Sequence, residues 1–597
     1  VMVGIAESFE LSVTRRLIPK LAPPYRQTAQ VYVDCVPKLY LALCRTDHNS
    51  KYCKRNYLAQ FLHEDPYIGL CFIMAMVAAK LLILENKRVS KTHTSVLVHP
   101  TYELVSMMVA GGLPPILTQV VKEGCVVPDA KVRYGVDQNT YLEATRGISD
   151  TKFKINEFIL ELFKYNEPYG DKVMTSRVVK CAELIRYEKS FKFGCFLDSR
   201  GRMYANTTIG ISPQGADHEK AMCIPIFSEA LTADGLTALV GAANDYSEDS
   251  RHTGLSTVDS ACLYAAQARD WHNLEWKAWD KPYSGMAIAK LLSDYVEAPE
   301  RPLAAFVPRD GRCSGLQHWS ALMRSDAITD RLGMELQEAT DGRDIYEFVA
   351  HTWEQLLEEI YKYMATRKVC KKPVMTFAYS ATRVSAMDNV CTMFPELDRK
   401  VACQLGSQLF NTTNKILQPI VAGVDWLKEC VGIICKTGTT QIIWVTPDGF
   451  IASQDYRVTE EKDITVTIRR RTHKITIKED VVNPDGTYNP KLSKHKSAIG
   501  PNVIHSLDAT HLRMVAIRLK EVGLPAVWVH DSFAVHANYI PFLDKVIREE
   551  FVKLYSGNYL QVLKSFWEGK YGVVLPEQPT LGNWDLNVIP KCDRFFL

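Results

Sequence analysis

Apolar residues follow two different patterns along the chain, and the change comes near residue 190. Up to about residue 165 they recur at helical spacing, with breaks at Pro23-Pro24, Gly111-Gly112 and Pro114-Pro115. The segment 150–163, DTKFKINEFILELF, fits a helix. Beyond residue 190, short apolar runs that end in polar residues alternate with helical patterns. These patterns predict a multidomain, mostly helical α+β protein.

Three of the predicted strands end in a carboxylate. KFGCFLD (192–198) is one, and LAAFVPRD (303–310), which precedes the helical pattern SGLQHWSALM, is another. In VWVHDSFAV (527–535), the triplet HDS separates two apolar half-strands, which predicts a tight reversal. Burying an unpaired carboxylate is costly, so Asp310 and Asp531 each need a compensating partner.

A predicted helix at 366–380, TRKVCKKPVMTFAYS, carries ionisable and aromatic residues at regular spacing. Four of them recur at every fourth position: Arg367, Lys371, Met375 and Tyr379. Because Pro373 removes one backbone hydrogen bond, the helix either begins close to Cys370 or is kinked there. The apolar run VMTFAY suggests that the helix is largely buried, and buried cations need an anion such as a triphosphate.

Another predicted helix spans 500–520, with Pro501 suited to its start. His505, Asp508 and His511 recur on one side of it at three-residue spacing. A metal site is conceivable there, but ordinary hydrogen bonds are favoured, and a histidine beside the sugar of a nucleotide would explain its place equally well. Further on, alternating residues in 464–468 and 475–477 predict a hairpin with a basic tip, which is either functional or a solvated turn.

The amino-acid composition excludes few classes of protein. Lys plus Arg (71) nearly balances Asp plus Glu (68), so any basic surface must be local. Sixteen cysteines without zinc-type spacing suggest reduced thiols. The apolar stretch 69–84 contains Lys80 and is short for a membrane span, so a buried helix is expected, and the N-terminus shows no secretory pattern.

Asp310 and Asp531 indicate a type of reaction if the fold brings them together. They would repel each other unless divalent cations lay between them, and magnesium prefers a few carboxylates together with phosphate oxygens and water. Two metals held in this way support phosphoryl transfer. The alternative to a shared metal site is that the two aspartates are unrelated acidic side chains on the surface. The cations at Arg367 and Lys371 suit a nucleoside triphosphate, because arginine makes bidentate phosphate contacts and lysine acts as a point charge or proton donor.

Six motifs together resemble the single-subunit, phage-type DNA-directed RNA polymerases, a group that includes the mitochondrial enzymes. They are DSRGRMY (198–204), DGRCSGLQHWSALMR (310–324), TRKVCKKPVMTFAYS (366–380), WVTPDGF (444–450), IGPNVIHSLDATHLR (499–513) and VHDSF (529–533). The resemblance covers about residues 150–597. It implies a right-hand polymerase fold with palm, fingers, a reduced thumb and a helical N-terminal domain.

The resemblance also assigns regions and partners. The implied regions are a helical N-terminal domain (1–149), a reduced thumb or linker (150–190), a first palm part (191–338), fingers (339–498) with a specificity-type hairpin (451–498), and the end of the fingers with a second palm part (499–597). The implied partners are a DNA template, the RNA product, ribonucleoside triphosphates and two Mg²⁺ ions, with no membrane. Kinship with phage enzymes implies a virus-encoded protein acting in the host-cell cytoplasm.

Residue roles follow from the same resemblance. Asp310, Gly311 and Asp531 match the metal site, and Lys371 matches the proton donor to pyrophosphate. The implied nucleotide-binding residues are Arg367, Lys371, Met375, Tyr379 and His505, of which Tyr379 and His505 sense the ribose 2′-hydroxyl. The implied contacts to template and hybrid are Arg200, Arg202, Ser314, Gln317 and Ser380. The hairpin tip, Arg469, Arg470 and Arg471, is expected to read promoter DNA in the major groove.

Some features depart from the family pattern. Ser380 stands where the family usually has glycine, and the chain ends in CDRFFL. The segments before the palm are short, so we expect promoter recognition or melting to need a partner protein, a missing upstream segment or single-stranded template. A family A DNA polymerase is the nearest alternative, but DGRCSG, HDS in place of HDE, and His505 argue against it. A non-catalytic nucleic-acid-binding subunit should have lost a metal carboxylate or Lys371.

Overall fold

A three-stranded antiparallel sheet, here called the central sheet, lies at the heart of the protein. Its strands are β7 (Phe306–Asp310), β12 (Val527–Val529) and β13 (Ser532–His536), in the order β12-β13-β7. Val307 pairs with Val535, and both are fully buried. The two segments that the sequence marked as strands ending in carboxylates are therefore neighbours, although more than 200 residues separate them.

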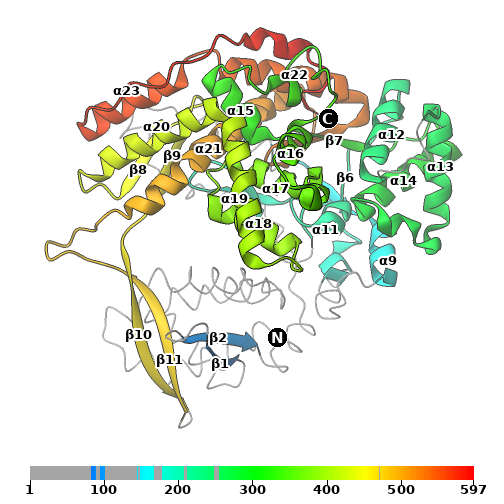
Figure 1. The fold of residues 1–597 in the computed structure, drawn as a ribbon. Coiled ribbons are helices and arrows are strands. Elements are labelled where there is room, and N and C mark those ends of the chain that lie inside the picture. Colours follow the sequence, from blue (N-terminus) through cyan, green and yellow to red (C-terminus); the bar gives the residue numbers. More distant parts are fainter. Residues whose placement is uncertain are drawn as a thin grey trace.

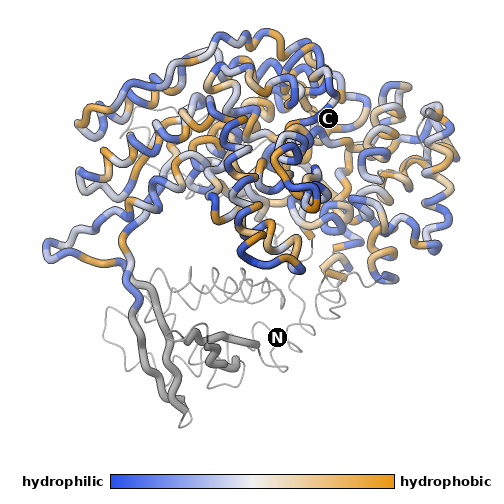
Figure 2. Tube along the Cα trace, viewed as in Figure 1, coloured by the Kyte–Doolittle hydropathy of each residue, from blue (hydrophilic) through white to orange (hydrophobic). Residues whose placement is uncertain are grey.

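The computed structural model describes residues 82–88, 94–100, 144, 148, 150–166, 178–179, 181–183, 185–206, 211–247, 254–468 and 471–596. Helices predominate in this part of the chain and surround several two-stranded hairpins and the central sheet (Figure 1). Orange and blue alternate along most helices in Figure 2, as expected for helices with one buried face. A search of these ranges for a membrane-spanning helix finds none with the required length and hydrophobicity.

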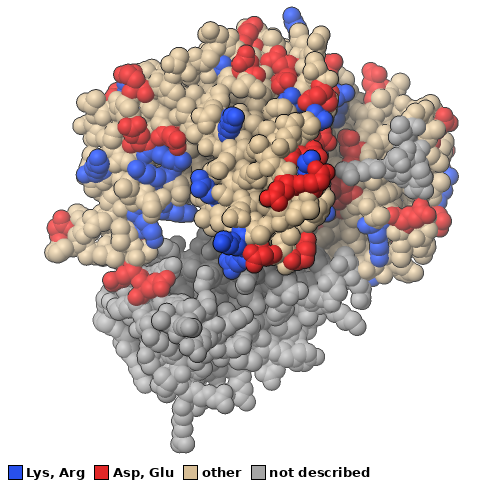
Figure 3. Space-filling view, viewed as in Figure 1, with Lys and Arg blue, Asp and Glu red and all other residues tan. Residues whose placement is uncertain are grey.

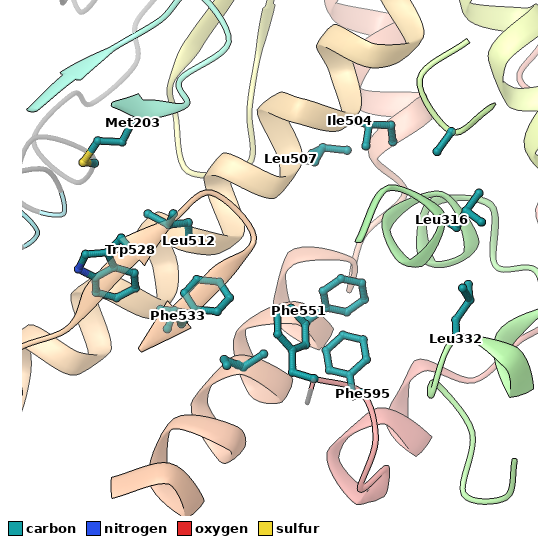
Figure 4. Packing of buried hydrophobic residues seen from close by; sticks show 14 of the residues in the cluster. Met203, Leu316, Leu332, Ile504, Leu507, Leu512, Trp528, Phe533, Phe551 and Phe595 are labelled. Atoms are coloured by element: carbon teal, nitrogen blue, oxygen red, sulfur yellow. The ribbon is translucent and has the colours of Figure 1, made fainter. Parts of the chain in front are cut away.

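The core beneath the central sheet comes from distant parts of the chain. Helix α15 (Ser314–Met323) follows β7 directly, and each of its residues is buried. Helices α21 (Leu492–Glu521) and α22 (Ile540–Leu554) complete this layer. Figure 4 shows Phe533, Phe551 and Phe595 packed together, and the rings of Phe551 and Phe595 are 4.8 Å apart in an edge-on arrangement. The helix predicted for SGLQHWSALM is confirmed.

Five α-helices follow α15 in the chain before the next described strand, β8. They are α16 (Ile345–Glu354), α17 (Arg367–Phe377), α18 (Arg383–Met393), α19 (Arg399–Ile416) and α20 (Gln418–Cys435). Thr366 caps α17, because its hydroxyl accepts from the Val369 amide at 3.4 Å. The helix therefore starts at Arg367 rather than near Cys370, and Pro373 lies inside it.

The prediction that Pro501 starts a helix is wrong. Helix α21 begins nine residues earlier, at Leu492, and Pro501 lies within it. The preceding turns are held by packing against β9 (Ile451–Asp455): Gln454 Nε2 lies 3.1 Å from Nδ1 of the fully buried His495. This tertiary contact outweighs the single backbone hydrogen bond that proline removes.

The helix expected at 150–163 is also only partly correct. Residues Phe153–Ile155 form strand β3, and helix α9 (Glu157–Asn166) follows. Phe153 and Ile155 are buried while Lys154 between them is exposed, and the strand pairs with β6 (Cys223–Pro225). A period of two therefore describes the first residues better than the helical period does.

Two strands lie in the N-terminal region that was expected to be mostly helical. β1 (Leu82–Arg88) and β2 (Thr94–Pro100) form an antiparallel hairpin. The end of the expected buried helix at 69–84 thus belongs to a strand, and the rest of that prediction lies outside the described residues. The described ranges test neither the domain boundaries nor the reduced thumb.

A group of three helices was not anticipated. Helices α12 (Ala233–Ser247), α13 (Thr257–Arg269) and α14 (Pro282–Glu297) lie together on one side of the molecule (Figure 1). Helix α14 leads toward β7, and Asp217 accepts from the amides of Tyr283 and Ser284 in its first turn, at 2.7 and 3.2 Å. This group places Lys281, immediately before α14, beside the end of β7.

The remaining strands form hairpins. These are β4 (Gly194–Leu197) with β5 (Met203–Asn206), β8 (Gln441–Val445) with β9, and β10 (Thr459–Ile468) with β11 (Arg471–Asp480). The predicted hairpin at 464–477 is confirmed and extends away from the helical body, with β11 beside β2 (Figure 1). Its tip residues Arg469 and Arg470 lie outside the described part, and only the backbone of Arg471 is described.

The remaining α-helices of the described part are α11 (Asp217–Ala221) and α23 (Tyr559–Tyr571). Its 3-10 turns are Trp271–Asn273, Glu275–Ala278, Thr329–Arg331, Glu359–Met364, Ala537–Tyr539 and Leu586–Lys591.

Candidate active site

The two aspartates lie side by side at one end of the central sheet. Asp310 is the last residue of β7, and its register partner is Ser532, the residue after Asp531. Asp310 and Asp531 line one cavity of about 860 Å³, together with Gly311. The side chain of Asp310 is 54% exposed, so solvent and ligands can reach it. The predicted convergence of these two residues is therefore present in the fold.

The reversal at His530-Asp531 positions Asp531 between β12 and β13. His530 adopts a left-handed backbone conformation with φ 53°, which turns the chain within two residues. Burial lowers the pKa of His530 to about 4. The hydroxyl of Ser314, the first residue of α15, donates to Asp531 Oδ2 at 2.7 Å. A serine that the resemblance assigned to the hybrid thus orients a carboxylate of the predicted metal site.

The residues present fit a magnesium site. Two carboxylates and the carbonyl of Gly311 supply hard oxygen ligands, and the remaining positions suit phosphate oxygens and water. Across the described ranges no group of three or more His, Cys, Asp or Glu side chains forms a protein-only metal site. Lys281 Nζ is 3.8 Å from Asp310 Oδ2 and 4.5 Å from the ring centre of Tyr246. The sequence held no signal for Lys281, because only the fold brings it to Asp310.

Helix α17 presents its cations on an open face. Lys371 is exposed and has no ion-pair partner among the described residues, while Met375 is 39% exposed. Arg367 is about half exposed and donates to Asp344 at 2.8 Å. The expectation that these cations are buried is therefore wrong, because the buried face of the helix is formed by other residues, among them Val369, Val374 and Phe377. Exposed cations are available to a ligand that approaches from solvent.

Tyr379 lies just beyond the end of α17, where the chain meets α15. The indole nitrogen of Trp319 donates to the Ala378 carbonyl at 2.9 Å and fixes this approach. A Cβ on Gly315 would lie 2.9 Å from the hydroxyl of Tyr379, so a larger residue would displace the ring. Burial raises the pKa of Tyr379, and the nearby carboxylates Asp508 and Asp531 add to this shift. Tyr379 is therefore a neutral hydroxyl in the neighbourhood of Asp531.

His505 faces Tyr379 from helix α21. Their ring centres are 4.5 Å apart. Burial and the charges of Arg202 and Arg200 lower the pKa of His505 to about 2. The two residues predicted to act as a pair are brought together, and the imidazole is neutral.

Both arginines of the DSRGRMY motif contact protein groups. Arg200 binds Asp198 through Nε at 2.9 Å, and its Nη1 lies 2.8 Å from His505 Nδ1. Arg202 Nε donates to Asp508 at 3.1 Å, and Nη2 makes a second, shorter contact with the same carboxylate. Burial opposes the charge of Arg202, but Asp508 raises its pKa overall. Asp508, His505 and His511 thus have hydrogen-bond partners within the protein, since His511 Nε2 contacts the Ile547 carbonyl at 2.8 Å.

Two other predicted hybrid contacts, Gln317 and Ser380, have buried polar groups. Gln317 is 1% exposed, and its amide nitrogen donates to the carbonyls of Leu332 and Phe595 at 3.0 and 2.8 Å. Ser380 has φ 60°, and its buried hydroxyl has no hydrogen-bond partner in the described part. The left-handed conformation is the physical reason why glycine suits this position. Their roles at a hybrid stay predictions.

Comparison of the sequence with known protein families assigns the chain to a family. The family described as DNA-dependent RNA polymerase matches residues 258–580, just over half of the chain. The chain belongs to this family. The resemblance inferred from the six motifs and the right-hand, mostly helical α+β fold are thereby confirmed.

Three relatives illustrate the match. The mitochondrial DNA-directed RNA polymerase of Mus musculus is 29% identical over 362 residues, covering 54% of this chain and 29% of the relative. That of Homo sapiens is 29% identical over 357 residues, covering 54% and 28%. DNA-directed RNA polymerase 1, mitochondrial, of Nicotiana sylvestris is 27% identical over 363 residues, covering 54% and 34%. The chain spans about a third of the length of these relatives.

The names of these relatives correct one expectation. A virus-encoded enzyme acting in the host-cell cytoplasm was expected, but the relatives are named as mitochondrial or chloroplastic/mitochondrial polymerases. Resemblance to phage enzymes was a poor guide to origin, because mitochondrial polymerases match 54% of this chain.

Proposed function

We propose that this chain is a DNA-directed RNA polymerase that extends RNA on a template from ribonucleoside triphosphates. The observation that carries the proposal is the adjacency of Asp310 and Asp531 in one cavity, with Tyr379 near Asp531 and His505 beside Tyr379. Family membership supplies the reaction class, and the six motifs supply the residue roles.

Asp310, Asp531 and the Gly311 carbonyl would hold two magnesium ions. When bound, these ions activate the attacking hydroxyl and stabilise the leaving oxygen of the displacement. Ser314 keeps Asp531 oriented through its 2.7 Å hydrogen bond. Lys371 and Arg367, exposed on α17, bind the triphosphate, and Lys371 donates a proton to the departing pyrophosphate.

The remaining roles belong to the same proposal. Met375 and Tyr379 contact the incoming nucleotide, and His505 recognises its ribose together with Tyr379. Template or hybrid contacts come from the region of Arg200, Arg202, Ser314, Gln317 and Ser380. The hairpin tip Arg469, Arg470 and Arg471 reads promoter DNA in the major groove.

Primed RNA extension with the purified chain in magnesium tests the reaction. We expect template-dependent incorporation of ribonucleotides, and chelation of the metal should abolish it. Asp531→Asn should abolish synthesis while template binding, measured by fluorescence anisotropy, stays largely intact. Asp425→Asn, a surface carboxylate beside Lys428, is the matched control. Undiminished synthesis by Asp531→Asn would refute the metal assignment.

The same assay with deoxyribonucleotides separates this function from that of a DNA polymerase. A strong preference for deoxyribonucleotides would overturn the proposal, and no incorporation of either substrate would favour a non-catalytic binding subunit.

Promoter recognition or strand opening needs a partner protein, a further upstream segment or single-stranded template. A promoter-specific run-off assay on linear duplex DNA tests this requirement. Success with this chain alone would remove it.

A further inference from the structure

A short chain of side chains connects the turn after β4 with the ribose-sensing pair. Nη1 of Arg200 lies 2.8 Å from Nδ1 of His505, across 305 positions of sequence. An arginine guanidinium has only N–H donors and remains charged at all accessible pH values. The ring nitrogen that it contacts must therefore be the acceptor.

This contact determines where the imidazole proton resides. A neutral histidine carries one proton, so a ring whose Nδ1 accepts must be protonated on Nε2. The cationic form, in which both nitrogens donate, is excluded because burial and the neighbouring arginines lower the pKa of His505 to about 2. Nε2 has no hydrogen-bond partner among the described residues, and the residue is only half-buried. His505 is thus a permanent donor at Nε2.

Arg200 is itself held in place by Asp198 and Tyr204. Nε of Arg200 donates to Asp198 Oδ2 at 2.9 Å, and Nη2 binds the same oxygen at 2.5 Å and the hydroxyl of Tyr204 at 3.2 Å. Oδ1 of Asp198 accepts from the backbone amides of Arg200 and Arg202 at 2.9 and 3.0 Å, which closes the turn. The carboxylate also balances the guanidinium charge, so the arginine can lie beside a half-buried ring.

We propose that Arg200 is a positioning residue for sugar selection, which fixes His505 as the Nε2-protonated tautomer so that this N–H donates to the ribose 2′-hydroxyl of the incoming nucleotide. The inference rests on the proposed function, in which His505 and Tyr379 recognise the ribose. A deoxyribonucleotide lacks the oxygen acceptor and leaves the N–H unpaired. Sites that donate to a substrate hydroxyl discriminate strongly against analogues that lack it.

The first test reads the tautomer without any substrate. In protein labelled with ¹⁵N-histidine, the imidazole nitrogen shifts of His505 distinguish a protonated Nε2 from a protonated Nδ1, and the His505→Gln variant assigns the signal. We expect Nε2–H in the unmodified protein and in Arg200→Lys, which retains a donor. Arg200→Met should show a mixture of tautomers. An Nδ1-protonated or cationic ring in the unmodified protein would overturn the proposal even if the enzyme is fully active.

The second test compares kcat/KM for a ribonucleotide and its deoxy analogue in primed extension. Arg200→Met should lower the ribo/deoxy ratio by about tenfold, the value of one hydrogen bond, and Arg200→Lys should restore most of it. Arg269→Met, which removes an exposed arginine paired with Glu297, should leave the ratio unchanged. An unchanged ratio in Arg200→Met would refute the positioning role. Failure of the unmodified chain to incorporate ribonucleotides would instead refute the proposed function, while the tautomer measurement would still stand.

Discussion

At the scale of single residues, the site depends on charges that are paired where they are buried and open where a ligand must reach them. Asp508 is buried and faces the largely buried side chain of Arg202, whereas Lys371 and Asp310 are exposed. Desolvation explains the division, because a buried ion needs a partner, whereas an exposed ion stays hydrated and can be reached by a ligand.

Asp508→Asn should lower the free energy of unfolding by about 1 to 3 kcal/mol, because asparagine is neutral like the protonated carboxyl but accepts only one of the two hydrogen bonds from Arg202. Urea unfolding measures this loss, and Asp425→Asn, at an exposed pair, should cost less than about 1 kcal/mol. A loss as small as that of the control would show that Arg202 finds another partner.

The same carboxyl should also make stability depend on pH. Burial raises the pKa of Asp508 to about 6, whereas an unfolded aspartate titrates near about 3.9. The folded state therefore binds the proton more tightly, so the contribution of this group is largest below about pH 4 and falls as the pH rises toward 6. Unfolding measured over this range should show that decline in the unmodified protein and not in Asp508→Asn.

Ser380→Gly should raise the free energy of unfolding by about 1 kcal/mol. The substitution relieves a left-handed backbone at φ 60° and removes a buried hydroxyl that lacks a partner, although glycine gains entropy in the unfolded chain. Ser380→Ala removes only the hydroxyl and should gain less. Thermal denaturation of the three proteins compares them, and destabilisation by glycine would mean that the conformation is not strained.

At the scale of elements, α17 depends on its neighbours for its orientation. Helices α18 and α19 pack against each other, and α18 reaches α17 through Asn389, whose amide nitrogen donates to the Val369 carbonyl at 3.3 Å. Gly406 of α19 lies against the backbone of α18, since a Cβ there would be 2.6 Å from the Met387 Cα. The position of the exposed cationic face of α17 therefore depends on a close contact between helices.

Gly406→Ala should destabilise the protein by roughly 1 to 3 kcal/mol, because backbone atoms cannot move aside as a flexible side chain can. Gly241→Ala, in α12, is the matched control: a Cβ there meets nothing within 4 Å, so the better helix propensity of alanine should stabilise the protein by about 0.5 to 1 kcal/mol. Chemical denaturation measures both variants. Equal effects would mean that α18 and α19 separate freely.

At the scale of the whole molecule, the C-terminal residues lie beside the candidate active site. Phe596 forms a β-bridge with Gly311, and Gln317 donates to the Phe595 carbonyl at 2.8 Å. Both phenylalanines are buried against the core beneath the central sheet. The C-terminal residues therefore support the backbone next to Asp310. Figure 3 shows acidic and basic side chains interspersed over one face of the described part, in keeping with the balanced composition.

Phe595→Ala should lower the free energy of unfolding by about 3 to 5 kcal/mol through the cavity that it leaves. Val574→Ala, at a side chain that is 88% exposed, should change it by less than about 0.5 kcal/mol. Calorimetric unfolding compares the two. A mild effect of Phe595→Ala would indicate that the tail packs loosely.

The sequence alone determined the elements whose residues share one local pattern: the reversal at Asp531, the helix Ser314–Met323, the β10–β11 hairpin and the motifs that identify the family. Period-two and period-3.6 patterns are local, and charged residues that interrupt apolar strands are visible without a fold. Tertiary structure alone decided that α21 runs through Pro501, that residues 153–155 pair as a strand, that the α17 cations face outward, and that Arg200 reaches His505. Each of these depends on partners far apart in the chain, and only the packed core determines which distant groups come within hydrogen-bonding distance.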